Sequence, residues 1–198
     1  DCSYCHNEPA TALYENYTTA TIDLDGDDTE EYWDHTYGRR MYTQVVFRDQ
    51  TTRESSEIMF VQITFAQNTT HLFMFADWDT QGTSNAGTAF DGVSVLWNIN
   101  ATEENPNYVD GMMTQDGYAD LWMLKATEAD VNNTIVESDM QDWAMSDEGV
   151  IKSETDDVKA VLRHHVEMVR DRPATFYTAE FARPLVTSDS TDVQFDMN

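Results

Sequence analysis

Basic residues are scarce in this chain: 11 lysines and arginines stand against 37 aspartates and glutamates in 198 residues, a formal net charge of −26 at pH 7. Nucleic-acid binding needs a basic surface, and anionic membranes repel an acidic one, so the composition argues against both partners. Long apolar runs are also absent, and no stretch of 18 residues is apolar enough to span a membrane. The acidic excess indicates a solvated surface, with an electrostatic face for a cationic partner or for metal ions as the alternative.

Cysteine is almost absent, and the two cysteines lie together. Cys2 and Cys5, followed at once by His6, form a C-x-x-C-H sequence, which is typical of covalent c-type haem attachment. Both thiols add to the haem vinyl groups, and the histidine becomes the proximal iron ligand. A zinc site would need a second cysteine pair, and a thioredoxin-like dithiol would follow a strand. We therefore predict one covalent haem c, with a bare disulfide or a metal clip as the alternative.

A haem held by one histidine needs a second axial ligand. The remaining histidines are His35, His71, His164 and His165. On a helix the adjacent pair would point about 100° apart, so only one of the two could serve a given iron. We expect His165 or His164 to be the distal ligand, on this chain's haem or on that of a neighbouring subunit. The alternatives are a core histidine on an apolar face and a methionine ligand, since the chain has 10 methionines.

Three features indicate export. Asn-x-Ser/Thr sequons begin at Asn16, Asn68, Asn100 and Asn132, which are candidate glycosylation sites. Haem c is attached on the outer side of an energised membrane, and the cysteines lie beside the first residue, as after removal of a signal peptide. We expect an extracellular or cell-surface glycoprotein.

Periodicity divides the chain into an arm and one domain. Residues 1–18 are expected to form an N-terminal arm that carries the haem motif, and residues 19–198 a single domain. Alternation with period two predicts strands at 41–47, 58–65, 71–76, 93–99, 118–125, 175–181 and 192–195. Many short strands rich in β-branched and aromatic residues predict an antiparallel β-sandwich. The acidic residues 23–28 are expected to form a turn, because their spacing does not match a calcium loop.

One segment has a helical period instead. Ser153 and Asp156 resemble a capping box, and Pro173 would end a helix. One helical face would carry Val158, Val161, Leu162, His165 and Val169. The pattern predicts an amphipathic helix at about 154–171.

The segments Asp91-Gly-Val-Ser-Val-Leu-Trp-Asn-Ile99, 119–126 and 181–185 resemble the haem-binding domain of the ethylbenzene dehydrogenase gamma-subunit family, which is related to DOMON domains and family 9 carbohydrate-binding modules. The resemblance spans about residues 20–198 and implies a β-sandwich. It also implies a possible second, non-covalent haem b, with Lys125 and Met112 or Met113 as matching ligands; the alternative is a strand-end lysine and core methionines. The C-x-x-C-H arm lies outside the resemblance, and the family's further strand after Arg-Pro-Leu is missing.

These observations predict an exported c-type cytochrome that carries electrons through its haem. No enzyme activity is expected, since no Ser/His/Asp order, zinc spacing or phosphate loop occurs. The arm, the missing strand and the spare histidine would also suit an extracellular filament of identical subunits. The alternatives are a haem-relay subunit of a larger molybdenum oxidoreductase and a carbohydrate-binding module. The latter would use a tryptophan platform built from Trp33, Trp78, Trp97, Trp122 or Trp143.

Overall fold

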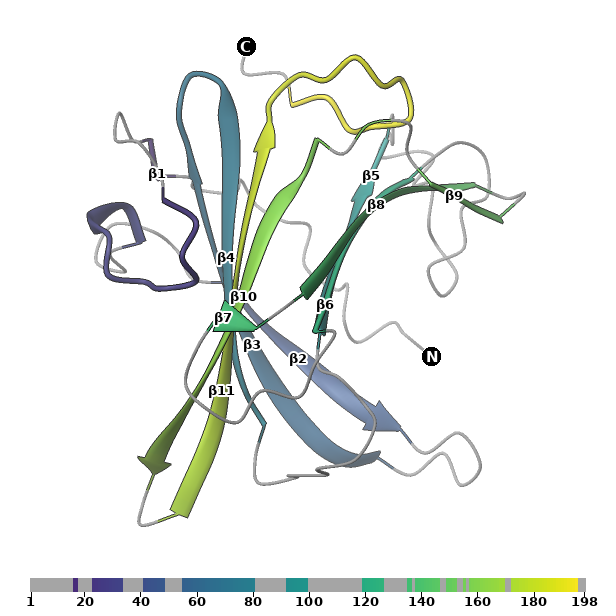
Figure 1. Ribbon diagram of the computed structural model, residues 1–198. Coiled ribbons are helices and arrows are strands. Elements are labelled where there is room, and N and C mark those ends of the chain that lie inside the picture. Colours follow the sequence, from purple (N-terminus) through teal and green to yellow (C-terminus); the bar gives the residue numbers. More distant parts are fainter. Residues whose placement is uncertain are drawn as a thin grey trace.

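The computed structural model describes residues 16–17, 23–33, 41–48, 55–80, 92–99, 119–126, 135–136, 138–146, 149–152, 155, 157–169 and 172–195. These residues form two β-sheets and one short 3₁₀ helix, η2 (Glu31–Trp33). The small sheet covers one face of the large sheet, and the segment 23–33 lies on the opposite face (Figure 1). The predicted antiparallel β-sandwich is confirmed. Within this described part, no helix has the length and apolarity needed to cross a membrane.

The two sheets have different strand orders. The large sheet runs β1–β3–β4–β11–β10–β7, and β2 pairs with β3. Its strands are β1 (Asn16–Tyr17), β2 (Met41–Arg48), β3 (Ser55–Gln67), β4 (His71–Thr80), β7 (Ile135–Val136), β10 (Lys159–Val169) and β11 (Arg172–Pro184). The small sheet runs β5 (Gly92–Asn98), β6 (Ala119–Ala126), β8 (Ser138–Ser146) and β9 (Gly149–Lys152). Neighbouring strands are antiparallel, except that the two residues of β1 pair with β3 in parallel.

The main core lies between the two sheets. Alternate residues of β4, which include Met74 and Trp78, meet Phe181 of β11 and Trp122 and Leu124 of the small sheet. All five side chains are at most 4% exposed. Burial of each large apolar side chain contributes about 1.5–3 kcal/mol, so this layer supplies most of the stability.

A second core covers the other face of the large sheet. Trp33 of η2 packs on Phe75 of β4 with ring centroids 5.5 Å apart, and Tyr32 and Phe73 join them. The central strand β4 of the large sheet is therefore buried on both faces. This explains why residues 72–76 of β4 form a continuous apolar run instead of alternating with polar residues.

The buried Glu180 of β11 holds the segment 23–33 against the sheet. Its Oε2 accepts hydrogen bonds from the backbone N–H groups of Asp25 at 2.8 Å and Gly26 at 2.6 Å. Its Oε1 accepts a third from Nε1 of Trp33 at 2.8 Å. Thr178 Oγ1 adds a bond to the carbonyl oxygen of Gly26 at 2.6 Å. Burial raises the pKa of Glu180 to about 7, although the three donors favour the carboxylate.

The acidic residues at 23–28 form a tight bend, as expected. Gly26 has φ of 76°, and a Cβ at this position would lie 2.8 Å from the Cβ of Arg163, so the close approach to β10 requires glycine. Asp27 forms an ion pair with the Arg163 guanidinium, and its N–H donates to Asp25 Oδ1 at 2.9 Å. The carboxylates of this bend therefore fasten it to the sheet and to itself.

The helix predicted at about 154–171 is wrong, because residues 159–169 form strand β10. This strand pairs with β11 along its whole length, from Lys159 opposite Ala182 to Val169 opposite Arg172. Val158, Ala160 and Leu162 face the main core, so a period of two was present beside the helical spacing. The valine-rich composition and the long partner strand favour the extended conformation.

The strand predicted at 192–195 is also wrong. Residues 185–195, which we call the C-terminal loop, follow β11 without regular structure. The loop closes on itself, since the N–H of Phe195 donates to the carbonyl oxygen of Leu185 at 2.8 Å. Phe195 then packs on Trp97 with ring centroids 5.1 Å apart. The alternating apolar residues Val193 and Phe195 suggested a strand. Instead, their side chains pack against the main core and hold the loop in place.

At about pH 5 the Glu180→Gln variant should lower the free energy of unfolding by about 2–3 kcal/mol, because an amide NH₂ would face backbone or indole N–H donors. The effect should depend on pH. The pKa of Glu180 is about 7 in the fold against an ordinary value of 4.5, so the folded chain retains this proton longer than the unfolded chain. The wild type therefore loses up to about 3 kcal/mol from this group as pH rises through that window, and the variant does not.

Urea unfolding followed by circular dichroism at about pH 5 and about pH 8 measures this difference. The stability gap between wild type and variant should be larger at the lower pH. Thr29→Ala, an exposed change in the same segment, is the control and should be nearly neutral at both values. A stability difference between wild type and variant that increases with pH would contradict the prediction that Glu180 keeps its proton to a higher pH in the folded chain than in the unfolded chain.

Candidate functional site

The predicted haem-attachment residues Cys2, Cys5 and His6 lie outside the described residues, as does His35. His71, His164 and His165 belong to strands that the structure describes. The described residues therefore give information on the second axial ligand but not on the covalent attachment of the haem.

His164 lies in β10 with its side chain only 5% exposed. The strand register places it opposite Tyr177 of β11, which in turn lies opposite Trp78 of β4. The rings of His164 and Tyr177 have centroids 5.1 Å apart, and those of Tyr177 and Trp78 stack at 5.6 Å. We call these three residues the aromatic row. It crosses three neighbouring strands on the face of the large sheet that carries the main core.

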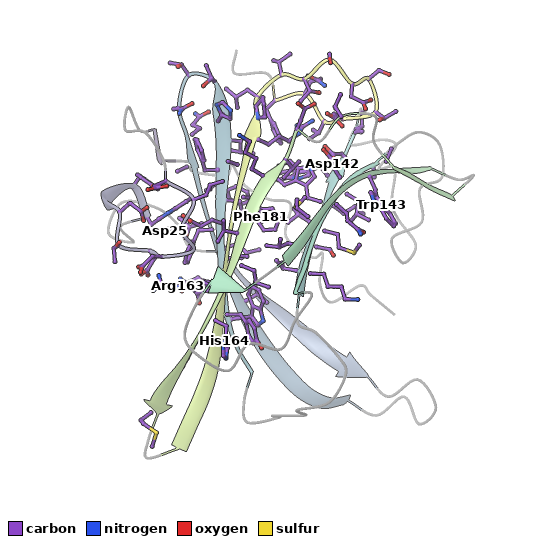
Figure 2. All side chains as sticks on the ribbon, in the orientation of Figure 1. Asp25, Asp142, Trp143, Arg163, His164 and Phe181 are labelled. Atoms are coloured by element: carbon purple, nitrogen blue, oxygen red, sulfur yellow. The ribbon has the colours of Figure 1, made fainter. Side chains whose placement is uncertain are left out.

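The aromatic row holds one buried imidazole against an aromatic ring. Imidazole nitrogen is an axial ligand of haem iron, and packing against a neighbouring ring fixes the direction in which the imidazole points. His164 lies in the lower half of Figure 2, well below the C-terminal loop at the top of the view. The row can therefore offer an oriented nitrogen ligand from the centre of the large sheet.

The other two histidines are placed differently. His71 begins β4 at a hairpin, where its Nδ1 lies 2.8 Å from Thr70 Oγ1 and its ring stacks on Phe73 at 5.9 Å. These local contacts account for its position. His165 pairs with Phe176 in the backbone register, and its side chain lies outside the described part. Of the predicted pair, His164 is the one whose surroundings the structure shows.

Two of the predicted glycosylation sites fall in strands or turns. Asn16 lies in β1, and Asn68 lies in the hairpin between β3 and β4, whereas Asn100 and Asn132 lie outside the described residues. Asn68 Oδ1 accepts hydrogen bonds from the N–H groups of Thr70 at 2.9 Å and of the following residue at 2.8 Å. The turn therefore uses the side-chain oxygen, and these bonds leave the amide nitrogen, where a glycan attaches, unused.

The residues that the family resemblance suggested for a haem b are not brought together in the described part of the chain. Lys125 is exposed on β6 of the small sheet. Met112 and Met113 lie outside the described residues. The second haem therefore stays a prediction from the family resemblance.

Most of the tryptophans fill the cores. Trp33, Trp78 and Trp122 are buried, and Trp97 packs against Phe65 at 5.9 Å and against Trp122 at 5.0 Å. A sugar-binding platform needs an exposed ring face, which the buried Trp33, Trp78 and Trp122 do not present. Trp143 is half-buried on β8.

A second buried polar site was missed from the sequence. Asp120 of β6, Asp142 of β8 and Asp192 of the C-terminal loop are buried and bring carboxylate oxygens within 4.8 Å of one another. Arg183 of β11, also buried, places Nη2 3.0 Å from Asp192 Oδ2 and 3.5 Å from Asp120 Oδ2. We call these four residues the inter-sheet charge cluster, because they join both sheets and the loop.

Neighbouring groups fix the cluster in place. The Arg183 guanidinium lies 5.6 Å from the ring centroid of Trp122 and 5.5 Å from that of Phe195, and it donates a short hydrogen bond to the carbonyl oxygen of Val193. The N–H of Val193 donates to Asp120 Oδ2 at 3.1 Å. Arg183 therefore holds both the small sheet and the C-terminal loop.

The carboxyl groups of the cluster differ in their partners. Burial raises the pKa of Asp120 to about 6, although Arg183 acts in the opposite direction. Burial, with Asp120 and Asp192 nearby, raises the pKa of Asp142 to about 8. In its ionised form, Asp142 meets no hydrogen-bond donor with either oxygen among the described residues. The cluster has three carboxylates and one guanidinium, so its formal charge is −2 when all are ionised.

The sequence did contain a signal for this site. Asp120 alternates with Trp122 and Leu124, and Asp142 alternates with Ala144, so each aspartate stands at a core position of its strand. A charged residue in a core position needs a partner and marks a site to be explained. β8 itself was not predicted, so the position of Asp142 could not be seen.

No known family model and no curated protein matches this chain. Its function is therefore inferred from its own residues and geometry.

The Arg183→Met variant should lower the free energy of unfolding by about 3–5 kcal/mol, because it leaves buried carboxylates without their guanidinium partner. Arg163→Met is the matched control. Its ion pair with Asp27 is about a third exposed, at 34% and 29% for the two side chains, so its loss should cost about 0–1 kcal/mol. Urea unfolding followed by circular dichroism compares the two. Equal losses of unfolding free energy in the two variants would contradict the prediction that the buried Arg183 stabilises the fold more than the partly exposed Arg163.

Proposed function

We propose that this protein is an exported c-type cytochrome that carries electrons through one haem attached at Cys2 and Cys5. The observation that carries the proposal is the C-x-x-C-H sequence, because a disulfide or a metal clip has no need of a histidine directly after the second cysteine. His6 is the proximal ligand. When bound, the haem supplies one-electron redox chemistry, and the protein supplies attachment, axial ligands and surroundings.

His164 is the residue that we assign as the distal ligand. Support comes from the aromatic row, in which a buried imidazole is held against the ring of Tyr177. Ligation by two histidines gives a lower reduction potential than ligation by histidine and methionine. The iron that His164 binds belongs either to the same chain or to a neighbouring subunit.

A filament of identical subunits is the sharper form of this proposal. In the described residues, β10 pairs with β7 on its outer side only at Leu162 and Arg163. An exposed strand edge carries unpaired N–H and carbonyl groups that a second chain can use. Electron microscopy of native material distinguishes a filament from a single-chain carrier.

Replacing both Cys2 and Cys5 by alanine should abolish covalent haem attachment, because no other thiol is present in the chain. The intact mass of the wild type should exceed that of the polypeptide by one haem, and the variant should show the polypeptide mass alone. Ser3→Ala, a change between the two cysteines, is the control and should keep the haem. A wild-type chain without added haem mass, produced in a host that matures c-type cytochromes, would rule out the proposal.

Replacing His164 by alanine should convert a low-spin, six-coordinate haem into a high-spin form, because the iron loses its distal nitrogen. Absorption and electron paramagnetic resonance spectra of the oxidised protein report the change. His71→Ala and His165→Ala are the controls and should keep the low-spin spectrum. A low-spin spectrum that survives in His164→Ala and is lost in His165→Ala would move the assignment to the neighbouring residue.

A further inference from the structure

We propose that the inter-sheet charge cluster is a calcium site, with Asp120, Asp142 and Asp192 as its carboxylate ligands. The site lies apart from the aromatic row: Figure 2 shows Asp142 just beneath the C-terminal loop, and His164 lies far below it. The proposal does not depend on the haem.

Three of the four residues form an ion-paired group, although Arg183 Nε and Nη2 have no partner with hydrogen-bond geometry among the described residues. Arg183 Nη2 reaches Asp192 Oδ2 at 3.0 Å and Asp120 Oδ2 at 3.5 Å. Asp192 Oδ2 also accepts from Thr187 Oγ1 at 2.7 Å, and Asp120 Oδ2 accepts from the N–H of Val193 at 3.1 Å. The arginine and these neighbours therefore account for one oxygen of each carboxylate.

Asp142 is not accounted for by this group. Its side chain is 1% exposed, and within the part of the chain that the structure describes its carboxyl group meets only the carboxyl group of Asp120, a hydrogen bond that requires a shared proton. Asp120 Oδ1 is buried as well, and the side chain of Trp122 serves the Asp120 carboxylate as a hydrogen-bond partner. A buried carboxylate without a partner is costly, so it requires a cation or a proton. The oxygens of Asp142 are thus the ones most available to an ion.

Charge and distance favour calcium. The cluster has a formal charge of −2 when ionised, which one divalent cation neutralises. All the donors are oxygens, which hard cations prefer. Oxygens on opposite sides of a calcium ion are about 4.6–5.2 Å apart, so a separation of up to 4.8 Å is compatible with calcium. One oxygen from each aspartate lies within 4.8 Å of the other two, so all three can contact a single calcium ion.

The position of the site suggests a structural purpose for a bound ion. It lies under the C-terminal loop, where Val186 is 70% exposed and Ser188 and Ser190 are exposed as well. A bound ion would link Asp192 of this loop to Asp120 of β6 and Asp142 of β8. Calcium should therefore stabilise the closure of the loop over the end of the sandwich.

Calcium titration of the full-length, chelator-treated protein tests the site by calorimetry and by thermal unfolding. We expect one saturable site, and a rise in Tm of about 5–10 °C at a calcium concentration 100-fold above Kd. Titration in about 0.5 M sodium chloride screens weak binding to the acidic surface. Asp142→Asn should abolish both signals, while Asp23→Asn, which removes an exposed charge, should keep them.

The outcomes separate a cation from a proton. Saturable binding that Asp142→Asn and Asp192→Asn each remove supports the site, and the second variant decides if the first does not fold. Two results would overturn it. One is a wild type without a calcium-dependent rise in Tm, which leaves Asp142 neutralised by a proton. The other is an equal rise in the wild type and in a folded Asp142→Asn, which assigns the effect to the acidic surface.

Discussion

Strand β11 carries a buried charge on each of its two faces, and every layer of the fold is attached through one of them. Glu180 faces the segment 23–33 and accepts its N–H groups. Three residues later, Arg183 faces the other way and holds the small sheet through Asp120 and the C-terminal loop through Asp192. Successive strand residues point to opposite faces, so residues an odd number apart serve different layers. The apolar cores supply most of the free energy, and these two charges determine where the outer layers attach.

Much of the fold could be predicted from the sequence, because a half-buried strand has a local pattern. The strands β2 to β6 and β11 all contain alternating or continuous apolar residues. β10 was misread because Val158, Val161 and Leu162 fit a helical spacing as well as an extended one. Only the long pairing with β11 decides between them, and that partner is not visible in the local sequence. β8 was missed because Asp142 occupies a core position, which breaks the apolar alternation.

The candidate sites also differ in whether a local sequence pattern reveals them. The haem motif could be predicted because its three residues lie within five positions of the sequence. The histidine pair could be singled out because His164 and His165 are adjacent. The aromatic row depends on strand register, which brings Tyr177 and Trp78 beside His164. The inter-sheet charge cluster collects residues from three strands and a loop. No spacing rule joins such positions, so they emerge only when the two sheets are placed face to face.

The central position of β11 also constrains how the chain folds. β11 follows every other strand in the sequence, yet it lies between β4 and β10 in the large sheet. Its pairing with β4 closes a loop of long sequence separation, and contacts of this kind form slowly. Until they form, the β3–β4 hairpin presents an open, strongly apolar edge on which aggregation can begin. The net charge of −26 opposes association at that stage, since like-charged chains repel each other before the last strand is inserted.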